Sequence, residues 1–445
     1  MTTLDSGGSI AGYFDCPWPA ECGGPRRQKV ASSPGLSLGP QERLGSVVRS
    51  TGGWAVMLVR RAPGELYLLC GASLAEGELP PVHRSVGPSS GWVEQVDPKT
   101  LRTLRRSDEL PGGGWLWCGA LVAHENGDLY AVNGRNVFRL DAHCRLIGKR
   151  ELPADAPHNG LVILSDGNLV VRNLGFRRSD RAQFVLLAPD LEPLGEPLEL
   201  PERCMGRISS DRSSSGEFLY STTPGEVFRI RYSAGMLELD TSWRRSYLVE
   251  GGGQSDAWDT SIADESVWLM DMGRPPNWMR PGSAPQRAFR FGLEPLGATD
   301  IVEDFDAPFA WNPGPPLYDP IRKILVHYDS LNGGVTAHRF ESGADPQRLW
   351  RRDYRNYMQM MVYADTGELV LEDATWPTRF GGDEDRSQAV LVSIETGEER
   401  GRATTGAPSL GMFPTPGFDR DFYVTSIPGE ITRVFVEETI PAPDT

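Results

Sequence analysis

The side chains best suited to catalysis in this sequence stand just before, or inside, a series of short strand-like runs. The imidazole of His158 has an ordinary pKa near neutrality, so it is the strongest candidate for a general acid or base. Arg207 offers the planar fork that binds a carboxylate or sulfate. Asp256, in the stretch Gly251–Gly273, and Tyr357 stand at corresponding places in later runs. We therefore predict that His158, Asp256, Tyr357 and Arg207 are the catalytic residues.

Aromatic and amide side chains recur at the same places and would line a binding site. The predicted substrate-binding residues are Trp258, Trp311, Asn312 and Gln359. Asp256 and Asp259 bracket Trp258, but residues three apart in an extended strand point to opposite faces. These two carboxylates are therefore not predicted to act as a paired acid and base. In a second interpretation they cap turns, and Trp258 packs between neighbouring modules.

No spacing in the sequence requires a metal ion. The histidines, at positions 83, 124, 143, 158, 327 and 338, contain no HxH or HxxxH pair. His124, His327 and His338 lie in or beside strand-like runs and are predicted to be structural. If the protein holds an ion, oxygen ligands from Asn159, Asp259 and Asn312 would suit Ca²⁺ or Mg²⁺. We predict no cofactor, with calcium or magnesium as the alternative.

A repeated turn-and-strand pattern runs along most of the chain and must position these side chains. Its anchor residues are Leu66, Leu129, Leu169, Phe218, Val267, Ile324, Leu369 and Phe422. Consecutive anchors are 40–63 residues apart, which is the range of a four-stranded propeller blade with loops of variable length. Further strand-like runs flank each anchor, Asp and Gly fill the turns, and helical periodicity is scarce.

These modules predict an all-β fold, a single β-propeller with eight blades, or seven as the alternative. The last module runs out after Val436, and Gly45–Arg49 is predicted to supply its fourth strand and close the ring. The predicted organisation is an irregular Gly- and Pro-rich arm at 1–45, the propeller at 46–437 and a loose tail at 438–445. Because innermost strands line the channel of a propeller, the candidate residues are expected to meet there.

The repeat style, with turns such as Val96–Thr103 and Ser393–Gly401, resembles that of the broad superfamily of quinoprotein-alcohol-dehydrogenase-like propellers over residues 50–437. The resemblance implies the same fold, with PQQ-like or WD40-like repeats. In that family the quinone cofactor is commonly associated with two adjacent cysteines. The cysteines here stand at positions 16, 22, 70, 118, 144 and 204, and no two are adjacent. Pyrroloquinoline quinone (PQQ) is therefore not expected.

Composition narrows the range of partners and compartments. The chain has 60 acidic and 45 basic residues, a net charge of −15, which disfavours nucleic acid and anionic membranes as partners. No apolar run approaches the roughly 20 residues that a membrane helix needs, and the first residues lack a signal-peptide pattern. The low cysteine density favours reduced thiols, with a Cys16–Cys22 disulfide as the alternative. We predict a cytoplasmic location.

The predicted function is catalysis on a small organic molecule in the central channel, by metal-independent acid–base chemistry. The reaction type, whether that of a lyase, an isomerase or cyclase, or a hydrolase, stays open because propellers carry many functions. One alternative is a non-catalytic propeller that binds a ligand or a protein partner. Another is a Ca²⁺- or Mg²⁺-dependent hydrolase, similar in its ligand logic to lactonase propellers.

Overall fold

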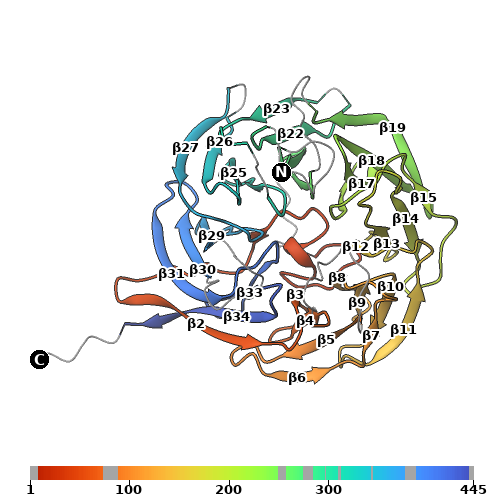
Figure 1. Ribbon diagram of the computed structural model, residues 1–445, viewed down its shortest axis with the longest axis horizontal. Coiled ribbons are helices and arrows are strands. Elements are labelled where there is room, and N and C mark those ends of the chain that lie inside the picture. Colours follow the sequence, from red (N-terminus) through yellow and green to blue (C-terminus); the bar gives the residue numbers. More distant parts are fainter. Residues whose placement is uncertain are drawn as a thin grey trace, which may run out of the picture.

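The computed structural model describes residues 9–73, 89–248, 257–273, 284–295, 297–308, 312–341, 344–375 and 387–439. Over these residues the chain forms short strands and one turn of 3-10 helix, η2 (Glu21–Gly23), and no α-helix. The strands form eight sheets that stand around a central axis like the blades of a propeller (Figure 1). The predicted all-β propeller is confirmed, with eight blades rather than seven.

The first four blades follow one another along the chain, and each runs from an inner to an outer strand. Blade 1 contains β3 (Ala55–Arg60), β4 (Leu66–Cys70), β5 (Ser90–Val96) and β6 (Thr103–Arg106), with β7 (Leu110–Pro111) paired to β5. Blade 2 contains β8 (Cys118–Ala123), β9 (Leu129–Asn133), β10 (Asn136–Leu140) and β11 (Leu146–Glu151). Blade 3 contains β12 (His158–Ile163), β13 (Leu169–Asn173), β14 (Gln183–Leu187) and β15 (Leu198–Glu199). Blade 4 contains β16 (Ser209–Ser213), β17 (Gly216–Thr223), β18 (Glu226–Ser233) and β19 (Met236–Ser246).

The remaining blades complete the ring, and two of them take a strand from the N-terminal part of the chain. Blade 5 contains β20 (Ser261–Ala263), β21 (Ser266–Met270), β22 (Ala288–Gly292) and β23 (Thr299–Val302). Blade 6 contains β24 (Leu317–Asp319), β25 (Ile324–Tyr328), β26 (Val335–Arg339) and β27 (Gln347–Arg352). Blade 7 contains β28 (Met361–Tyr363), β29 (Glu368–Ala374), β30 (Ser387–Ser393) and β31 (Glu399–Gly406), with β1 (Val30–Ala31) beside β28. Blade 8 contains β32 (Pro414–Pro416), β33 (Asp421–Thr425), β34 (Glu430–Glu438) and β2 (Glu42–Ser50).

Burial falls from the axis to the outside of the ring. Inner strands such as β8 and β12 are buried at every residue, and so are the second strands β9 and β13. The outer strand β6 is exposed at every residue. The apolar cores lie between consecutive blades, where Phe218 and Tyr220 of blade 4, for example, pack in one cluster with Val267 and Leu269 of blade 5. Sheets that cover each other in this way leave only outer strands to solvent.

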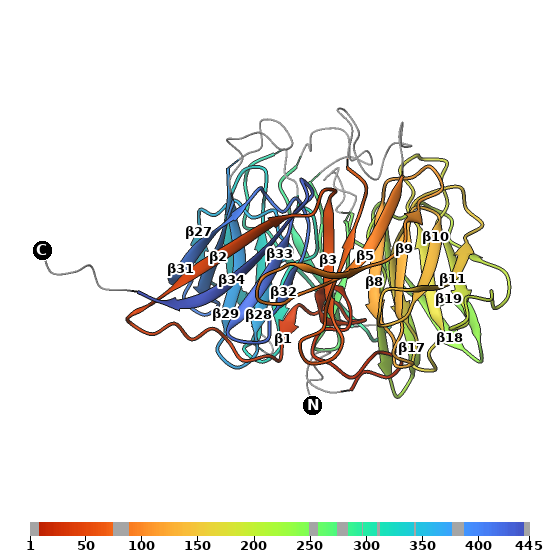
Figure 2. The ribbon, with the colours of Figure 1, turned by 90° about the horizontal axis from the view of Figure 1, so that it is seen from below.

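The ring is closed by β2, as the sequence predicts. This strand pairs antiparallel with β34 over nine residue pairs, from Glu42 opposite Glu438 to Ser50 opposite Glu430. The predicted closing run, Gly45–Arg49, lies inside β2. The two ends of the propeller are therefore joined by backbone hydrogen bonds within blade 8 (Figure 2).

The segment before β2 crosses the central axis at η2, and its last part runs outward beneath blades 7 and 8 to the rim where β2 begins (Figures 1 and 2). Its carbonyls accept hydrogen bonds from the inner strands of blade after blade: Pro19 from Ala123 at 2.7 Å, Pro25 from Ser210 at 2.8 Å, Arg26 from Ile262 at 2.8 Å and Lys29 from Val362 at 2.9 Å. β1 then pairs in parallel with β28. The segment therefore forms a floor beneath the inner strands at one end of the ring.

The domain limits at residues 45 and 437 stay predictions, and residues 440–445 of the predicted tail lie outside the described residues. Across the described ranges, no helix has the length and apolar character needed to cross a membrane.

Candidate ligand site in the central channel

Two charged side chains of the N-terminal segment meet two charged side chains of the blades on the axis. Arg27 Nη2 donates a hydrogen bond to Asp259 Oδ2 at 2.9 Å, and Arg27 Nη1 pairs with Glu21. Glu21 Oε2 lies 2.8 Å from Arg207 Nε, and the backbone N–H of Arg207 donates to Asp259. None of these four side chains is more than 8% exposed. Their charges therefore form a closed, alternating circuit inside the propeller.

The local backbone is shaped for this circuit. Gly206, just before Arg207, passes so close to blade 5 that a Cβ there would lie 1.1 Å from the carbonyl oxygen of Trp258. In the N-terminal segment Cys22, Arg27 and Lys29 have φ angles of 57°, 55° and 62°. Residues other than glycine rarely adopt this conformation, and strain of this kind collects at functional sites. Three such residues in one short segment mark it as a functional candidate.

Arg172, on β13, has no partner for its charge among the residues that the structure describes. Its side chain is fully buried, and none of its three guanidinium nitrogens has a hydrogen-bond partner there. Burial lowers the pKa of Arg172 to about 9; the negative charge of Asp259 partly offsets this and the positive charge of Arg207 adds to it. The group remains cationic at neutral pH. A buried guanidinium without hydrogen bonds is costly unless an anion or ordered water satisfies it.

Lys29 is a second buried cation of the floor. It is 1% exposed, and its Nζ donates a hydrogen bond to the carbonyl of Pro315 at 2.7 Å. Burial lowers the pKa of Lys29 to about 7, against the attraction of Cys22 and Asp259. The ammonium group of Lys29 therefore gives up its proton more easily than that of an exposed lysine. We refer to Glu21, Arg27, Lys29, Arg172, Arg207 and Asp259 together as the axial cluster.

His158 lies at the start of β12 and is fully buried. Burial lowers the pKa of His158 to about 3, although the carbonyls of Gly134 and Ala156 partly oppose this. The imidazole is therefore neutral at physiological pH. A base this weak accepts protons poorly, so the ring suits hydrogen bonding better than proton abstraction.

The other predicted residues within the described ranges are held mainly by protein partners. Asn312 Nδ2 donates to the carbonyl of Asp271 at 2.8 Å, and Gln359 Nε2 donates to that of Pro313 at 3.2 Å. Tyr357 is fully buried, and burial raises the pKa of its hydroxyl. Trp258 is partly exposed, and its indole Nε1 has no partner among the described residues. Asp256 and Trp311 lie outside the described residues.

The predicted oxygen ligands for Ca²⁺ or Mg²⁺ are largely committed to other groups. Asn159 Oδ1 accepts a hydrogen bond from Trp117 Nε1 at 2.9 Å. Both carboxylate oxygens of Asp259 accept from Arg27 or Arg207. Asn312 Oδ1 is the remaining oxygen without a partner among the described residues. The three residues thus offer one free oxygen between them, which is fewer than a hard cation requires.

The cysteines contribute no disulfide and no reactive thiolate. All six cysteines are free. Cys16 and Cys22 therefore do not form the local disulfide that was the alternative prediction. Cys22 Sγ contacts Gln359 Oε1 at 3.8 Å, and burial raises the pKa of its thiol to about 11. Buried thiols of this kind are inert.

A surface pocket of about 790 Å³ lies between blades 5 and 6, with four cationic side chains in its walls. Each cation is paired: Arg290 with Asp300 at 3.2 Å, Arg322 with Asp319 at 2.9 Å, Lys323 with Asp264 at 2.8 Å and Arg339 with Glu395 at 3.5 Å. Each of the four cations in the pocket is therefore neutralised by an acidic side chain, whereas Arg172 of the axial cluster has no such partner among the described residues.

The sequence points to Arg207 and Asp259 but not to Glu21, Arg27, Lys29 or Arg172. Glu21, Arg27 and Lys29 precede the propeller. Arg172 lies within a strand-like run, but not at the place in the repeat from which the candidate residues were chosen. One signal was available: lysine is scarce in this chain, occurring only at 29, 99, 149 and 323. A lysine in an otherwise irregular, Pro-rich arm is therefore unusual.

No protein-family model matches this sequence, and no curated protein matches it. Solved structures are similar to it in fold. The quinohemoprotein alcohol dehydrogenase of Comamonas testosteroni has a TM-score of 0.64 over 96% of this chain and 82% of that one, with 10% identity. A europium-containing methanol dehydrogenase has 0.58 over 94% and 97%, with 11% identity, and the Dos1 propeller has 0.54 over 87% and 94%, with 10% identity. The resemblance predicted from the repeat style is thus confirmed for the fold.

This chain lacks the pair of adjacent cysteines that is commonly associated with the quinone cofactor in the family it resembles. No two cysteines are adjacent in the sequence. Cys118 and Cys70 are in contact across neighbouring blades through a hydrogen bond from Cys118 Sγ to the carbonyl oxygen of Cys70, at 3.5 Å. We therefore derive no chemistry from PQQ.

Proposed function

We propose that this protein binds a small organic anion, with a carboxylate or a similar oxyanion group, against the axial cluster. The observation that carries the proposal is the fully buried guanidinium of Arg172, whose three nitrogens have no partner within the described part of the chain. A planar guanidinium matches the two oxygens of a carboxylate, and such charge-assisted pairs are strong in a dry site.

The charge balance of the axial cluster favours an anion over water alone. Arg27, Arg172, Arg207 and Lys29 face the two carboxylates of Glu21 and Asp259. Ordered water would satisfy hydrogen bonds but leave this excess of positive charge uncompensated. A small anion satisfies both requirements at once.

The floor supports the same assignment. The N-terminal segment covers the inner strands at one end of the ring and contributes Arg27 and Lys29, so a ligand on the axis would be enclosed on that side. Trp258, partly exposed and with its indole N–H without a partner among the described residues, offers a further donor. Enclosed sites with few convergent polar groups are typical of small-molecule binding.

The test compares ligand-free wild type with Arg172→Met, using thermal unfolding and calorimetric titration with sulfate, phosphate and small mono- and dicarboxylates at constant ionic strength. At least one oxyanion is expected to stabilise the wild type, and the variant should bind it about 10- to 100-fold more weakly. Without ligand the variant should be at least as stable as the wild type, because it loses an unpaired buried charge.

The exposed Arg212 supplies the control: Arg212→Met should change neither binding nor stability. The proposal fails if no oxyanion is bound and Arg172→Met is destabilised by several kcal/mol, since Arg172 would then have a structural partner.

A catalytic role is the second candidate, and Lys29 favours it. A buried amine with a pKa of about 7 can act as a base or as a nucleophile toward a carbonyl. The acid–base chemistry predicted for His158, Asp256, Tyr357 and Arg207 stays a prediction, as do a protein partner and the cytoplasmic location. A titrated carboxylate that is consumed during calorimetry would identify an enzyme; one recovered intact would identify a binding protein.

A further inference from the structure

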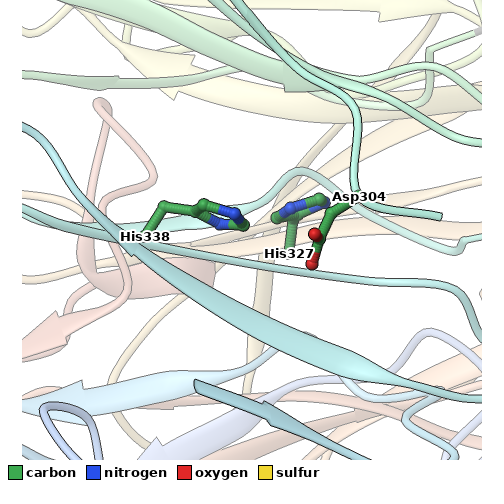
Figure 3. A group of neighbouring side chains, drawn as sticks. All are labelled: Asp304, His327 and His338. Carbon is green, nitrogen blue, oxygen red and sulfur yellow. The ribbon is translucent and has the colours of Figure 1, made fainter. Parts of the chain in front are cut away.

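We propose that Asp304, His327 and His338 form a binding site for a divalent transition-metal ion, with Zn²⁺ as the ion that fits them best. His327 lies on β25 and His338 on β26, which are neighbouring strands of blade 6. Asp304 lies in the segment that follows β23 and leads from blade 5 to blade 6. Figure 3 shows the two rings side by side, with the carboxylate of Asp304 next to His327.

The strand register brings the two histidines to one face of blade 6. His327 is opposite Thr336 and His338 is opposite Leu325, so all four side chains point to the same side of the sheet. One potential ligand atom of each histidine and of Asp304 lies within 4.8 Å of the others. Tetrahedral ligands about 2.1 Å from zinc are about 3.4 Å apart, so small side-chain rotations would complete the site.

Both imidazoles have a buried nitrogen without a hydrogen-bond partner in the described ranges. His327 is fully buried and His338 is 4% exposed, and their ring centroids are 5.3 Å apart. The two nitrogens are Nε2 of His327 and Nδ1 of His338. Nδ1 of His327 faces Gln286 Oε1 at 3.4 Å. A proton on Nδ1 would leave the lone pair of Nε2 for a metal, the arrangement in which metal-bound histidines are usually found.

Asp304 is held in place as an anion. Arg348 Nη1 donates a hydrogen bond to Asp304 Oδ1 at 2.8 Å, and Arg351 Nη1 donates to the backbone carbonyl of Asp304 at 2.8 Å. The ion pair with Arg348 favours the ionised form of the Asp304 carboxyl group. The site therefore offers one negative charge and two aromatic nitrogens to a dication.

The donor set determines the class of ion. Ca²⁺ and Mg²⁺ prefer oxygen ligands throughout, whereas imidazole suits zinc, iron, nickel and copper. Two histidines and one carboxylate provide three of the four ligands of tetrahedral zinc, which leaves one position for water. Asp304 belongs to the segment after β23, and the two histidines belong to blade 6. The bound ion would therefore also fix this segment to blade 6.

The experiment uses full-length protein, treated with a chelator, dialysed and titrated with Zn²⁺ in a calorimeter, with elemental analysis of the saturated protein. The variants are Asp304→Asn and His338→Gln, and Gln286→Met removes the group that faces His327. The exposed His143 supplies the control His143→Gln. Near-ultraviolet circular dichroism checks that each variant is folded.

Wild type and His143→Gln are expected to bind one Zn²⁺ per chain, and Zn²⁺ should raise their unfolding temperature. Gln286→Met should bind about 10- to 100-fold more weakly, and the two ligand variants should lose more than that. A wild type that takes up no Zn²⁺ would overturn the proposal. So would folded Asp304→Asn and His338→Gln variants that bind as tightly as the wild type. Neither result bears on the oxyanion site, which shares no residue with this one.

Discussion

Among single residues, the clearest contrast is between two buried arginines. Arg287 donates to Asp271 Oδ2 through Nε at 3.0 Å and Nη2 at 2.9 Å, and its backbone N–H donates to Oδ1 at 2.8 Å. Even so, burial raises the pKa of Asp271 to about 6. Arg172, equally buried, has no such carboxylate among the described residues. The fold supplies a partner for the buried charge of Arg287, and within the described ranges it supplies none for Arg172.

His158 should make the protein sensitive to acid. Its pKa is about 3 in the folded state and about 6.5 when unfolded, so between these values only the unfolded state binds the proton. Stability should therefore fall as the pH drops below about 6.5, by up to about 1.4 kcal/mol per pH unit from this residue. When the pH is lowered from 7 to 5, the free energy of unfolding should decrease by about 2 kcal/mol less in His158→Asn than in the wild type. Urea unfolding at the two pH values measures the difference.

His143→Asn, a change at an exposed histidine, is the reference and should keep the wild-type pH dependence. An unchanged slope in His158→Asn would mean that His158 is not the buried neutral group that the structure describes.

The element that departs most from expectation is the N-terminal segment. Its Gly- and Pro-rich sequence predicts an irregular arm, and apart from β1 and η2 it is irregular up to β2. Its position on the axis could not be predicted, because the partner of Arg27 in blade 5 is 232 residues away in sequence. Similarly, His327 and His338 become neighbours through the register of one hairpin, and Asp304 joins them from the preceding blade. A local sequence pattern does not indicate which distant residues come together in the folded chain.

The strands themselves are predictable because their signals are local. The run Gly127–Val132 predicts a strand after a turn, and β9 is found at Leu129–Asn133. Inner and outer positions also follow from the order of strands within each repeat. The corresponding positions of the repeats include Arg207 and Asp259, but the groups that these two side chains bind belong to the N-terminal segment.

Asp259→Asn tests whether the axial circuit anchors this segment. The change removes the charge that balances Arg27 at a site where neither side chain is more than 2% exposed, and it should cost about 3–5 kcal/mol in unfolding free energy. The comparison is Glu437→Gln, which breaks a pair with Arg43 whose side chains are 67% and 35% exposed, and should cost less than about 1 kcal/mol. Equal losses from the two variants in urea unfolding would contradict the anchoring role.

At the scale of the whole molecule, the ring depends on β2. It is the outer strand of blade 8 and pairs only with β34 among the described strands, so its successive N–H groups alternate between the sheet and solvent. Val47 and Val48 are adjacent and similarly exposed, at 39% and 42%. They form a matched pair for testing closure.

One of the two valines, Val47 or Val48, has its backbone N–H directed at β34, and the N–H of the other faces solvent. Proline at the position bonded to β34 should lower the free energy of unfolding by about 3 kcal/mol, and proline at the solvent-facing position should lower it much less. Because the blades form one ring, the damaging variant is expected to lower the midpoint of a single unfolding transition seen by fluorescence and circular dichroism together. Two separate transitions, or equal effects of Val47→Pro and Val48→Pro, would count against closure by β2.

Closure by β2 also has a consequence for biosynthesis. Residues 42–50 leave the ribosome well before their partners at 430–438, which are made almost four hundred residues later. Until then β2 has no strand to pair with, and contacts between such distant parts of a chain form slowly. A nascent chain interrupted before β34 would carry an unpaired strand edge, the kind of surface that joins polypeptides into aggregates. The strand that stabilises the finished ring is thus a hazard during its synthesis.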